Sequence, residues 1–286
     1  MMKFSLLDNS GNRSAFTYAI VFTILLCLLG TVGSCRKTSR ENTGRRAVIA
    51  TSDTILSGMA SRLVPRGQFT VISILPPDQC PGHYDVKLSD VRTMDDAALA
   101  LYFEDMPVGK HMAHAKTSQA ALNTGGVNWM APDNYIAGLD QVARALCNAF
   151  PQHAAAIEKN RTAYRREIDA LSRRLRAELA AAGAPGAVAA ASEMQRQNLE
   201  WMGLDVLCGY GRPESFSPRT VDNCVRQARE RGAALVADNL QSGPDAGLGI
   251  AQSLGAPHVV LRNFPSDKGY PATLEENVRA IIKALE

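Results

Sequence analysis

The sequence predicts an α/β protein of two lobes with parallel sheets, joined by one long backbone helix. Within residues 151–183, apolar side chains recur at steps of three, four or seven, as on one face of a helix. Residues 46–150 and residues 184–286 each alternate short apolar runs with amphipathic stretches, a pattern typical of parallel sheets covered by helices. The long helix is therefore expected to act as a spine between two lobes.

The predicted spine begins and ends at residues suited to helix termini. Pro151 stands where a first-turn proline is tolerated, and Gly183 stands where a left-handed residue ends a helix. At 1.5 Å per residue this helix would be roughly 45 Å long. The alternative interpretation is a long surface helix within one domain. The apolar stripe consists of Ile157, Tyr164, Ile168, Leu171, Leu175 and Leu179.

The first lobe, residues 46–150, is predicted to open with a strand, a helix and a second strand. The stretch between the third strand and residue 126 is predicted to be irregular. Strands are expected over residues 46–51, 69–75 and 99–103, and helices over residues 52–63, 89–98 and 133–149.

The second lobe, residues 184–286, repeats the alternation more regularly. Each of its strands is followed by a polar loop, which would lie at the carboxyl edge of a parallel sheet. If the strand ends of the two lobes face each other, the loops converge on one cleft between them. Strands are expected over residues 186–191, 205–208, 233–238 and 257–261, and helices over residues 194–202, 218–231, 247–254 and 274–285.

Composition narrows the function classes. The chain has 286 residues, enough for two domains, and a formal net charge of +3 without a dense run of lysine or arginine. Nucleic-acid binding therefore has no support in the sequence.

The N-terminus predicts export and a lipid anchor. Residues 15–33 form an uncharged, mostly apolar run that ends in small residues directly before Cys35, which resembles a bacterial lipobox. Residues 1–34 are thus predicted to be a lipoprotein signal peptide, Cys35 the lipidated residue and residues 35–45 a flexible tether. The alternative is an uncleaved transmembrane helix. Both interpretations place the remainder outside the cytoplasm.

Four further cysteines belong to the exported part of the chain, where disulfides are permitted. Sequence alone does not pair them, although a bridge between Cys208 and Cys224 is possible. The four are Cys80, Cys147, Cys208 and Cys224.

The loop PPDQCPGHYD carries His83 after the second strand, the loop VNWMAP carries Asn128 and Trp129, and the predicted spine follows them. This order of features resembles the solute-binding proteins of bacterial zinc and manganese ABC importers. The resemblance implies the two-lobe fold, a metal ion as cargo (zinc or manganese), and an ABC permease as partner of a monomeric protein.

The resemblance also implies a metal site of three histidines and one carboxylate, from which this chain departs. His83 matches the first ligand, but Asn128 stands at the second, Ser192 or Glu193 at the third, and Arg262 where the carboxylate is expected. One hypothesis is a redrawn site for a divalent or soft metal ion, in which thiolate and imidazole act together. Its candidate ligands are His83, Cys80, Glu193 and Asp238.

The second hypothesis is that the same scaffold binds a metal chelate or another small anionic solute. Arg212 and Arg262 would clamp acidic groups, and Trp129 or Tyr210 would offer a stacking face. The polar groups expected beside them are Asn128, Ser192, Asn239, Gln241 and Asn263.

A third hypothesis, an extracytoplasmic hydrolase, is disfavoured. Ser192, Ser242 and His258 lie outside any nucleophile-elbow or zinc-protease motif. The protein is therefore not expected to be an enzyme.

Overall fold

A computed structural model describes residues 46–212, 214 and 217–286. The predicted signal peptide, the tether and the expected lipid-attachment residue Cys35 lie outside the described residues. Residues 46–286 form one compact unit. No helix in the described part of the chain is long and apolar enough to cross a bilayer.

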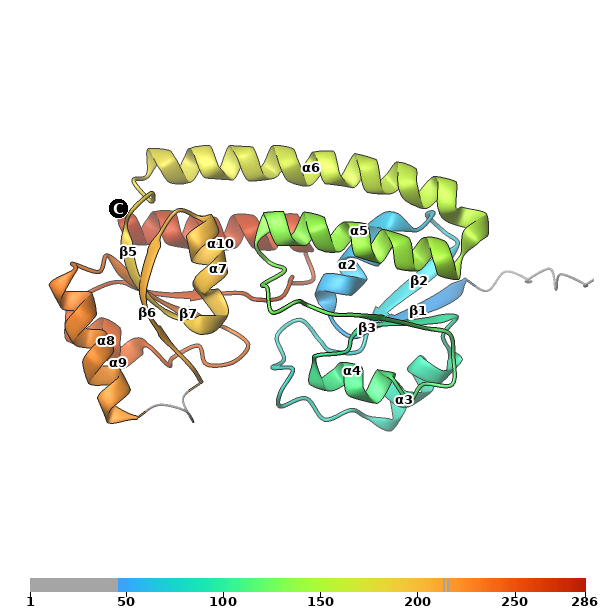
Figure 1. Cartoon of the computed structure of the whole chain (residues 1–286), viewed down its shortest axis with the longest axis horizontal. Helices are drawn as coiled ribbons and strands as arrows, with labels where there is room; N and C mark the ends of the chain where they lie inside the picture. The colour runs from blue at the N-terminus through green and yellow to red at the C-terminus, as the bar shows by residue number, and fades with distance from the viewer. Residues whose placement is uncertain (1–45, 213, 215–216) are drawn as a thin grey trace, which may run out of the picture. The chain divides into compact units, whose positions relative to one another are not determined.

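Two parallel four-stranded sheets form the centre of this unit. Figure 1 shows them one beside the other. Each places its first strand between its second and third strands, and its fourth strand at the edge beyond the third. The first sheet has the order β2-β1-β3-β4, with β1 (Ala47–Thr51), β2 (Phe69–Ser73), β3 (Leu99–Phe103) and β4 (Gln119–Leu122). The second has the order β6-β5-β7-β8, with β5 (Val188–Ser192), β6 (Asp205–Tyr210), β7 (Leu235–Asn239) and β8 (His258–Leu261).

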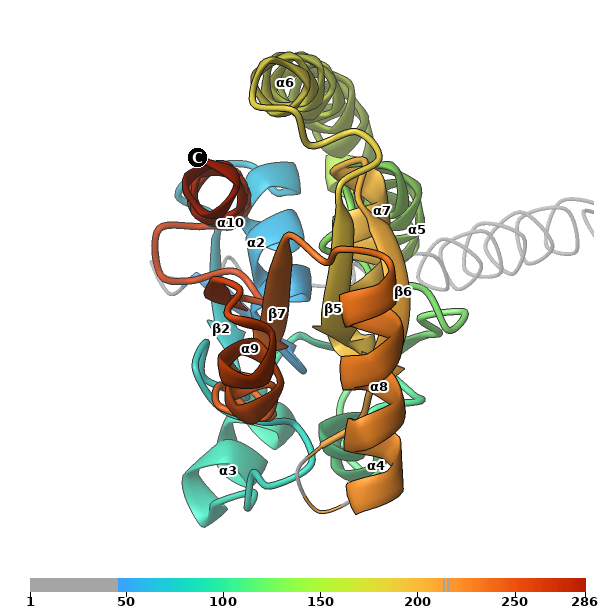
Figure 2. The same ribbon diagram turned by 90° about the vertical axis from the view of Figure 1, so that its left-hand side faces the viewer.

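Helices cover both sides of the sheets. The side that carries the spine holds α2 (Thr54–Leu63), α5 (Pro132–Ala149), α6 (Ala154–Ala181), α7 (Arg196–Trp201) and α10 (Tyr270–Leu285). The other side holds α3 (Leu88–Asp96) and α4 (Pro107–Met112) on the first sheet, and α8 (Pro218–Glu230) and α9 (Leu248–Leu254) on the second. In Figure 2, the helices of the spine side lie in the upper part of the view, and α3, α4, α8 and α9 lie in the lower part.

The hydrophobic core differs between the two sides. On the spine side one continuous cluster extends from Ile49 of the first sheet to Ile281 of α10. On the other side each sheet has a separate, smaller cluster, one around Tyr102 and one around Val236. Among the described residues, the buried apolar clusters therefore join the lobes only on the spine side.

The spine confirms the predicted periodicity, since all six residues of the stripe are buried. Its start differs slightly, because Pro151–His153 forms a 3-10 turn and α6 begins at Ala154. Its end is as expected, with Gly183 at φ 75°. The Ala184 amide bonds the Leu179 carbonyl at 3.0 Å, which closes the last turn.

Three tyrosines from different helices meet beneath the spine. The Tyr135 ring of α5 stacks on the Tyr270 ring of α10 at 3.5 Å between centroids. The hydroxyl oxygens of Tyr135 and Tyr164 of α6 lie 3.0 Å apart, and the Tyr270 hydroxyl donates to the Met130 carbonyl at 3.0 Å. We call Tyr135, Tyr164 and Tyr270 the tyrosine junction; it ties both lobes to α6.

Two elements fall in the stretch that the sequence predicted to be irregular. The helix α4 has six residues, and the strand β4 has four, two of them alanines. Such short segments lack the repeated apolar period that predicts an element. The helix α10 also begins at Tyr270, four residues before the predicted start at Leu274.

Cys208 of β6 and Cys224 of α8 form a disulfide, which fulfils the pairing that the sequence left open. The bridge holds α8 against the second sheet on the side away from the spine. Cys80 and Cys147 are free thiols.

Candidate functional site

Loops that follow strand ends of the two sheets contact each other, as expected if the strand ends face one another. Pro77 and Asp78 follow β2, and Asn128 follows β4. On the other lobe, Gln241 follows β7, and Arg262 and Asn263 follow β8. We call the contacts among these six residues the seam: Pro77, Asp78, Asn128, Gln241, Arg262 and Asn263.

Asn128 is the centre of the seam. Its side-chain amide donates to Asn263 Oδ1 at 2.5 Å and to the Met194 carbonyl at 2.7 Å, so both contacts cross to the second lobe. Its Oδ1 accepts from the Met130 amide at 2.8 Å. Its own backbone amide donates to Gln197 Oε1 at 2.6 Å. Asn128 therefore links the lobes by hydrogen bonds at the position where the resemblance implies a metal ligand.

A second set of contacts joins the loop after β2 to the second lobe. Gln241 Nε2 donates to the Pro77 carbonyl at 3.1 Å, and Gln241 Oε1 accepts from the Asn263 amide at 2.9 Å. The Arg262 guanidinium forms an ion pair with Asp78. Asn277 of α10 bonds both the amide and the carbonyl of Arg262, which fixes this backbone.

Buried amides support the seam from the second lobe. Gln195 has no exposed surface, and its Nε2 donates to Asn239 Oδ1 at 2.8 Å and to the Leu261 carbonyl at 3.2 Å. Asn198 donates to Gln195 Oε1 at 2.8 Å. Asn239 in turn donates to Ser242 Oγ at 2.6 Å. Asn239, a predicted ligand-binding residue, thus bonds Gln195 and Ser242, and supports the seam only indirectly.

The sequence did not single out five residues that take part in this network. Three of them lie in the amide-rich run Gln195 to Asn198, directly after a predicted strand-end loop, and this run could have indicated them. The other two, Asp78 and Asn277, could not be distinguished from ordinary surface residues before the fold brought them to the seam. The five are Asp78, Gln195, Gln197, Asn198 and Asn277.

Arg212 also faces the loop after β2. Its guanidinium lies against Gly82, where a Cβ atom would stand 2.7 Å from Nη1. Glycine at this position admits the guanidinium. Arg212 and Arg262 therefore both reach from the second lobe to the loop that carries His83.

The structure does not gather the predicted metal ligands into one site. Within residues 46–212, 214 and 217–286, no group of three or more His, Cys, Asp or Glu side chains is placed to hold a metal ion. Glu193 pairs with Arg196, whose hydrogen bonds hold the pKa of this carboxyl below its usual value. His83 and Cys80 share one turn, in which the His83 amide donates to the Cys80 carbonyl at 3.1 Å.

Asp238 is fully buried away from the seam and has its own partners. It accepts from the Tyr210 hydroxyl at 2.7 Å and from the Gly247 amide at 2.8 Å. Its Oδ2 lies 2.7 Å from His258 Nε2. This carboxylate is saturated by internal hydrogen bonds and contributes to the second-lobe core.

The predicted stacking faces are also buried. Trp129 is 4% exposed, and its ring packs edge-on against Phe103 at 4.6 Å between centroids. Tyr210 is 2% exposed and lies in the second-lobe core. Ser192 is 5% exposed. None of these three side chains presents a surface to a solute at the seam.

The seam therefore offers neutral amides and the Arg262–Asp78 ion pair, and the Arg212 guanidinium lies at the same loop beside Gly82. Zinc prefers nitrogen and sulfur ligands, and neutral carboxamide oxygens are poor competitors with water for it. Amides and guanidinium groups are instead suited to hydrogen-bonding a polar or anionic solute.

Residues 49–284 match the family model of the periplasmic component A of zinc-uptake complexes, ZnuA. The chain belongs to this family. The family confirms the expected α/β fold class. It also confirms the expected role, at the level of the family: a metal solute-binding protein that works with an ABC importer outside the cytoplasm. No curated protein sequence matches the chain.

Solved structures share the ZnuA-type fold at low identity. The manganese-bound periplasmic metal-binding protein of Candidatus Liberibacter asiaticus is similar at a TM-score of 0.72 and 17% identity, over 84% of this chain and 100% of that one. The periplasmic zinc-binding protein TroA of Treponema pallidum is similar at a TM-score of 0.70 and 14% identity, over 84% of this chain and 99% of that one.

Proposed function

We propose that this protein captures its metal as an anionic complex at the seam and delivers it to an ABC permease. The main support is Arg262, which stands where the family resemblance implies a carboxylate ligand. Its guanidinium forms an ion pair with Asp78 of the other lobe. By Coulomb's law a guanidinium repels a bare dication placed within several ångströms, whereas it attracts a complex with net negative charge.

Charge and hydrogen bonding at the seam support this cargo. Arg212 and Arg262 both contact the loop after β2, in which Asp78 pairs with Arg262. Asn128, Gln241 and Asn263 provide donors and acceptors that could exchange their present partners for the ligands of a metal complex. The metal itself would remain bound to the ligands with which it arrives.

The names of similar structures support a metal as the cargo. They include manganese-bound and cadmium-bound forms of the Liberibacter protein and the zinc-binding TroA. The proposed role involves no covalent chemistry.

A second candidate is a bare soft ion held by Cys80 and His83. The turn that joins these two residues favours it, because thiolate and imidazole from one loop suit zinc or copper(I). The other two ligands of this hypothesis already have partners. Glu193 would have to break its ion pair with Arg196, and Asp238 would have to give up its buried hydrogen bonds.

We also propose that the mature chain starts at Cys35 and is tethered to the membrane by lipid as a monomer. The lipobox-like sequence before Cys35 supports the anchor, and the family supports the location outside the cytoplasm.

Calorimetric titration of residues 46–286, purified without chelator, tests the cargo. The probes are zinc, manganese and copper(I) alone, the anionic zinc–citrate complex and the zinc–histidine complex. We expect binding of zinc–citrate only, and at least about tenfold weaker binding in Arg262→Gln, because a hydrogen bond to a charged group contributes about 1.5–3 kcal/mol. Arg279→Gln, an exposed arginine on α10, is the control and should bind as the wild type does.

One equivalent of bare metal, lost in His83→Ala, would contradict the proposal and favour the Cys80–His83 site. Absence of binding to every probe would place the cargo site elsewhere.

A further inference from the structure

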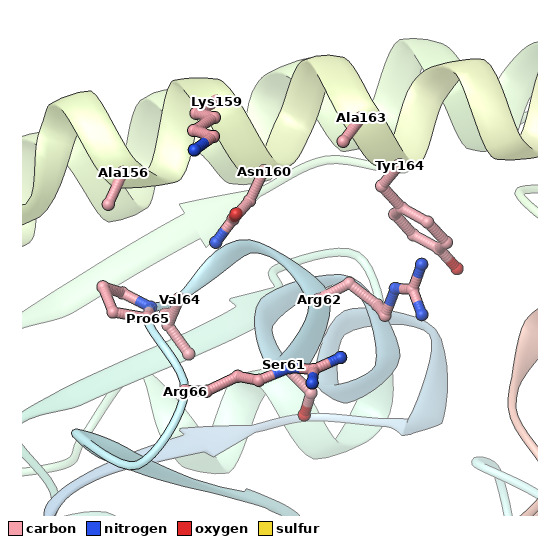
Figure 3. A pocket seen from close by; sticks show the side chains of 10 residues that line it. All are labelled: Ser61, Arg62, Val64, Pro65, Arg66, Ala156, Lys159, Asn160, Ala163 and Tyr164. Carbon is pink, nitrogen blue, oxygen red and sulfur yellow. The ribbon is translucent and has the colours of Figure 1, made fainter.

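A basic groove lies at the opposite end of the first lobe's strands from the seam, between the end of α2 and the first half of α6. It has a volume of about 470 Å³ and is lined by Arg62, Arg66, Lys159, Asn160 and Tyr164, among others. Figure 3 shows Asn160 and Tyr164 projecting from α6 toward the segment that carries Arg62, Pro65 and Arg66, with Lys159 on the same stretch of α6. The family-level function makes no use of this groove.

The cations of the groove are only partly neutralised. Arg62 forms an ion pair with Glu167, and its guanidinium stacks over the Tyr164 ring at 4.4 Å. In the described part of the chain, neither Arg66 nor Lys159 has an acidic partner within ion-pair distance, and both are exposed. The groove carries no acidic lining residue, so its field is positive.

The polar groups of the groove have a fixed framework. Asn160 Nδ2 donates to the Leu63 carbonyl at 2.9 Å, which ties α6 to the last turn of α2. Ile157 and Tyr164 anchor the same part of α6 in the core. Lys159 therefore projects from an anchored part of α6, and Arg66 follows Leu63, to which that part is bonded, by three residues.

The groove lies where the chain enters the compact unit. The Ala47 amide at the start of β1 donates to the Gln68 carbonyl at 3.1 Å, and Gln68 is two residues after Arg66. Arg46, the first described residue, directly precedes Ala47 and has an exposed basic side chain. The proposed acyl anchor, Cys35, precedes Arg46 by eleven residues, which reach at most ~38 Å when fully extended.

We infer that this groove docks on the membrane by binding the phosphate headgroup of an anionic phospholipid. The short connection to Cys35 would hold the groove near the bilayer, and Arg66, Lys159 and Arg46 match the negative charge of such a surface. The spine side at the first-lobe end would then face the lipid. The inference does not depend on which cargo the seam holds.

Cosedimentation of residues 46–286 with vesicles tests it without the lipid anchor. This part has its own core, and the family match runs over residues 49–284 within it. We expect binding to phosphatidylglycerol vesicles, no binding to phosphatidylcholine vesicles, and loss of binding at high salt. Arg66→Gln with Lys159→Gln should lower partitioning about 30-fold, since each basic residue near an anionic surface contributes roughly fivefold.

The matched control removes two exposed cations from the side of the sheets away from the spine. It is Lys110→Gln on α4 with Arg219→Gln on α8, and it should partition as the wild type does. An equal loss in this control would overturn the inference, because net charge alone would then explain binding. So would equal binding to both lipids, or calorimetric binding of inorganic phosphate without vesicle binding, which would indicate a site for a free anion.

Discussion

The two lobes are held together in two chemically different ways. Beneath the spine, the tyrosine junction is part of one apolar core that continues from the first sheet to α10. At the strand ends, the seam consists of amides and an arginine–aspartate pair. Separating packed apolar side chains removes their contribution to stability. The hydrogen bonds of a partly exposed seam can instead be exchanged for hydrogen bonds to a solute.

The difference indicates which region fixes the lobes and which can respond to cargo. Because the apolar contacts lie on one side only, the junction beneath the spine is expected to remain packed while the seam exchanges partners. This expectation agrees with the limited lobe motion implied by a helical linker.

The largest effect is expected from truncation within the tyrosine junction. Tyr135→Ala removes a fully buried ring that stacks on Tyr270, and should lower the free energy of unfolding by about 3–5 kcal/mol. Urea denaturation measures it. Tyr84→Ala, a half-buried tyrosine that bonds Asp90 within the first lobe, is the control and should cost about 1 kcal/mol. Equal losses would mean that the junction contributes nothing beyond ordinary burial.

A smaller effect is expected from a buried carboxylate at the strand ends of the first lobe. Burial raises the pKa of Asp53 to about 6, against hydrogen bonds from Ser52, Leu56 and Ile55 that lower it. The folded protein therefore binds this proton more tightly than the unfolded chain does. The resulting stabilisation is complete below pH 3.8 and is lost as the pH rises to about 6.

Asp53→Asn removes this titration and keeps an oxygen to cap α2. Between about pH 4 and about pH 7, the wild type should lose about 2 kcal/mol of stability relative to the variant. Chemical denaturation of both proteins at the two pH values measures the difference. Parallel pH dependences would show that Asp53 does not bind its proton more tightly when folded.

The smallest effect is expected at the seam itself. Asn128→Ala removes two hydrogen bonds to the second lobe and should cost about 1–2 kcal/mol, because the site is only partly buried. A double-mutant cycle with Asn263→Ala should give a coupling energy of about 1 kcal/mol. Additive losses would mean that the Asn128–Asn263 contact does not join the lobes in solution.

Much of the fold was predictable because it is written in local periodicity. The stripe from Ile157 to Leu179 identified the spine, and alternating strands and helices identified two parallel sheets. The six-residue α4 and the four-residue β4 were missed, because segments that short contain no repeated period.

The candidate site was predictable only in part. Gln241, Arg262 and Asn263 were found because each follows a predicted strand end, and Asn128 was found because it lies in the VNWMAP loop on which the family resemblance rests. Asp78 and Gln197 were not, since a single polar residue on a loop or short helix carries no sign of its distant partner. Trp129 and Tyr210 looked like binding residues by their loop positions, but packing turned both rings into the core.

The sequence by itself determined most of the secondary structure, the two sheets and the spine, because each depends on residues close together in the chain. Only the tertiary structure decided which strand-end side chains meet. Asn128 and Asn263 are 135 positions apart, and Arg262 and Asp78 are 184 apart. Contacts at that separation arise from the packing of whole lobes against the spine, so no local pattern encodes them.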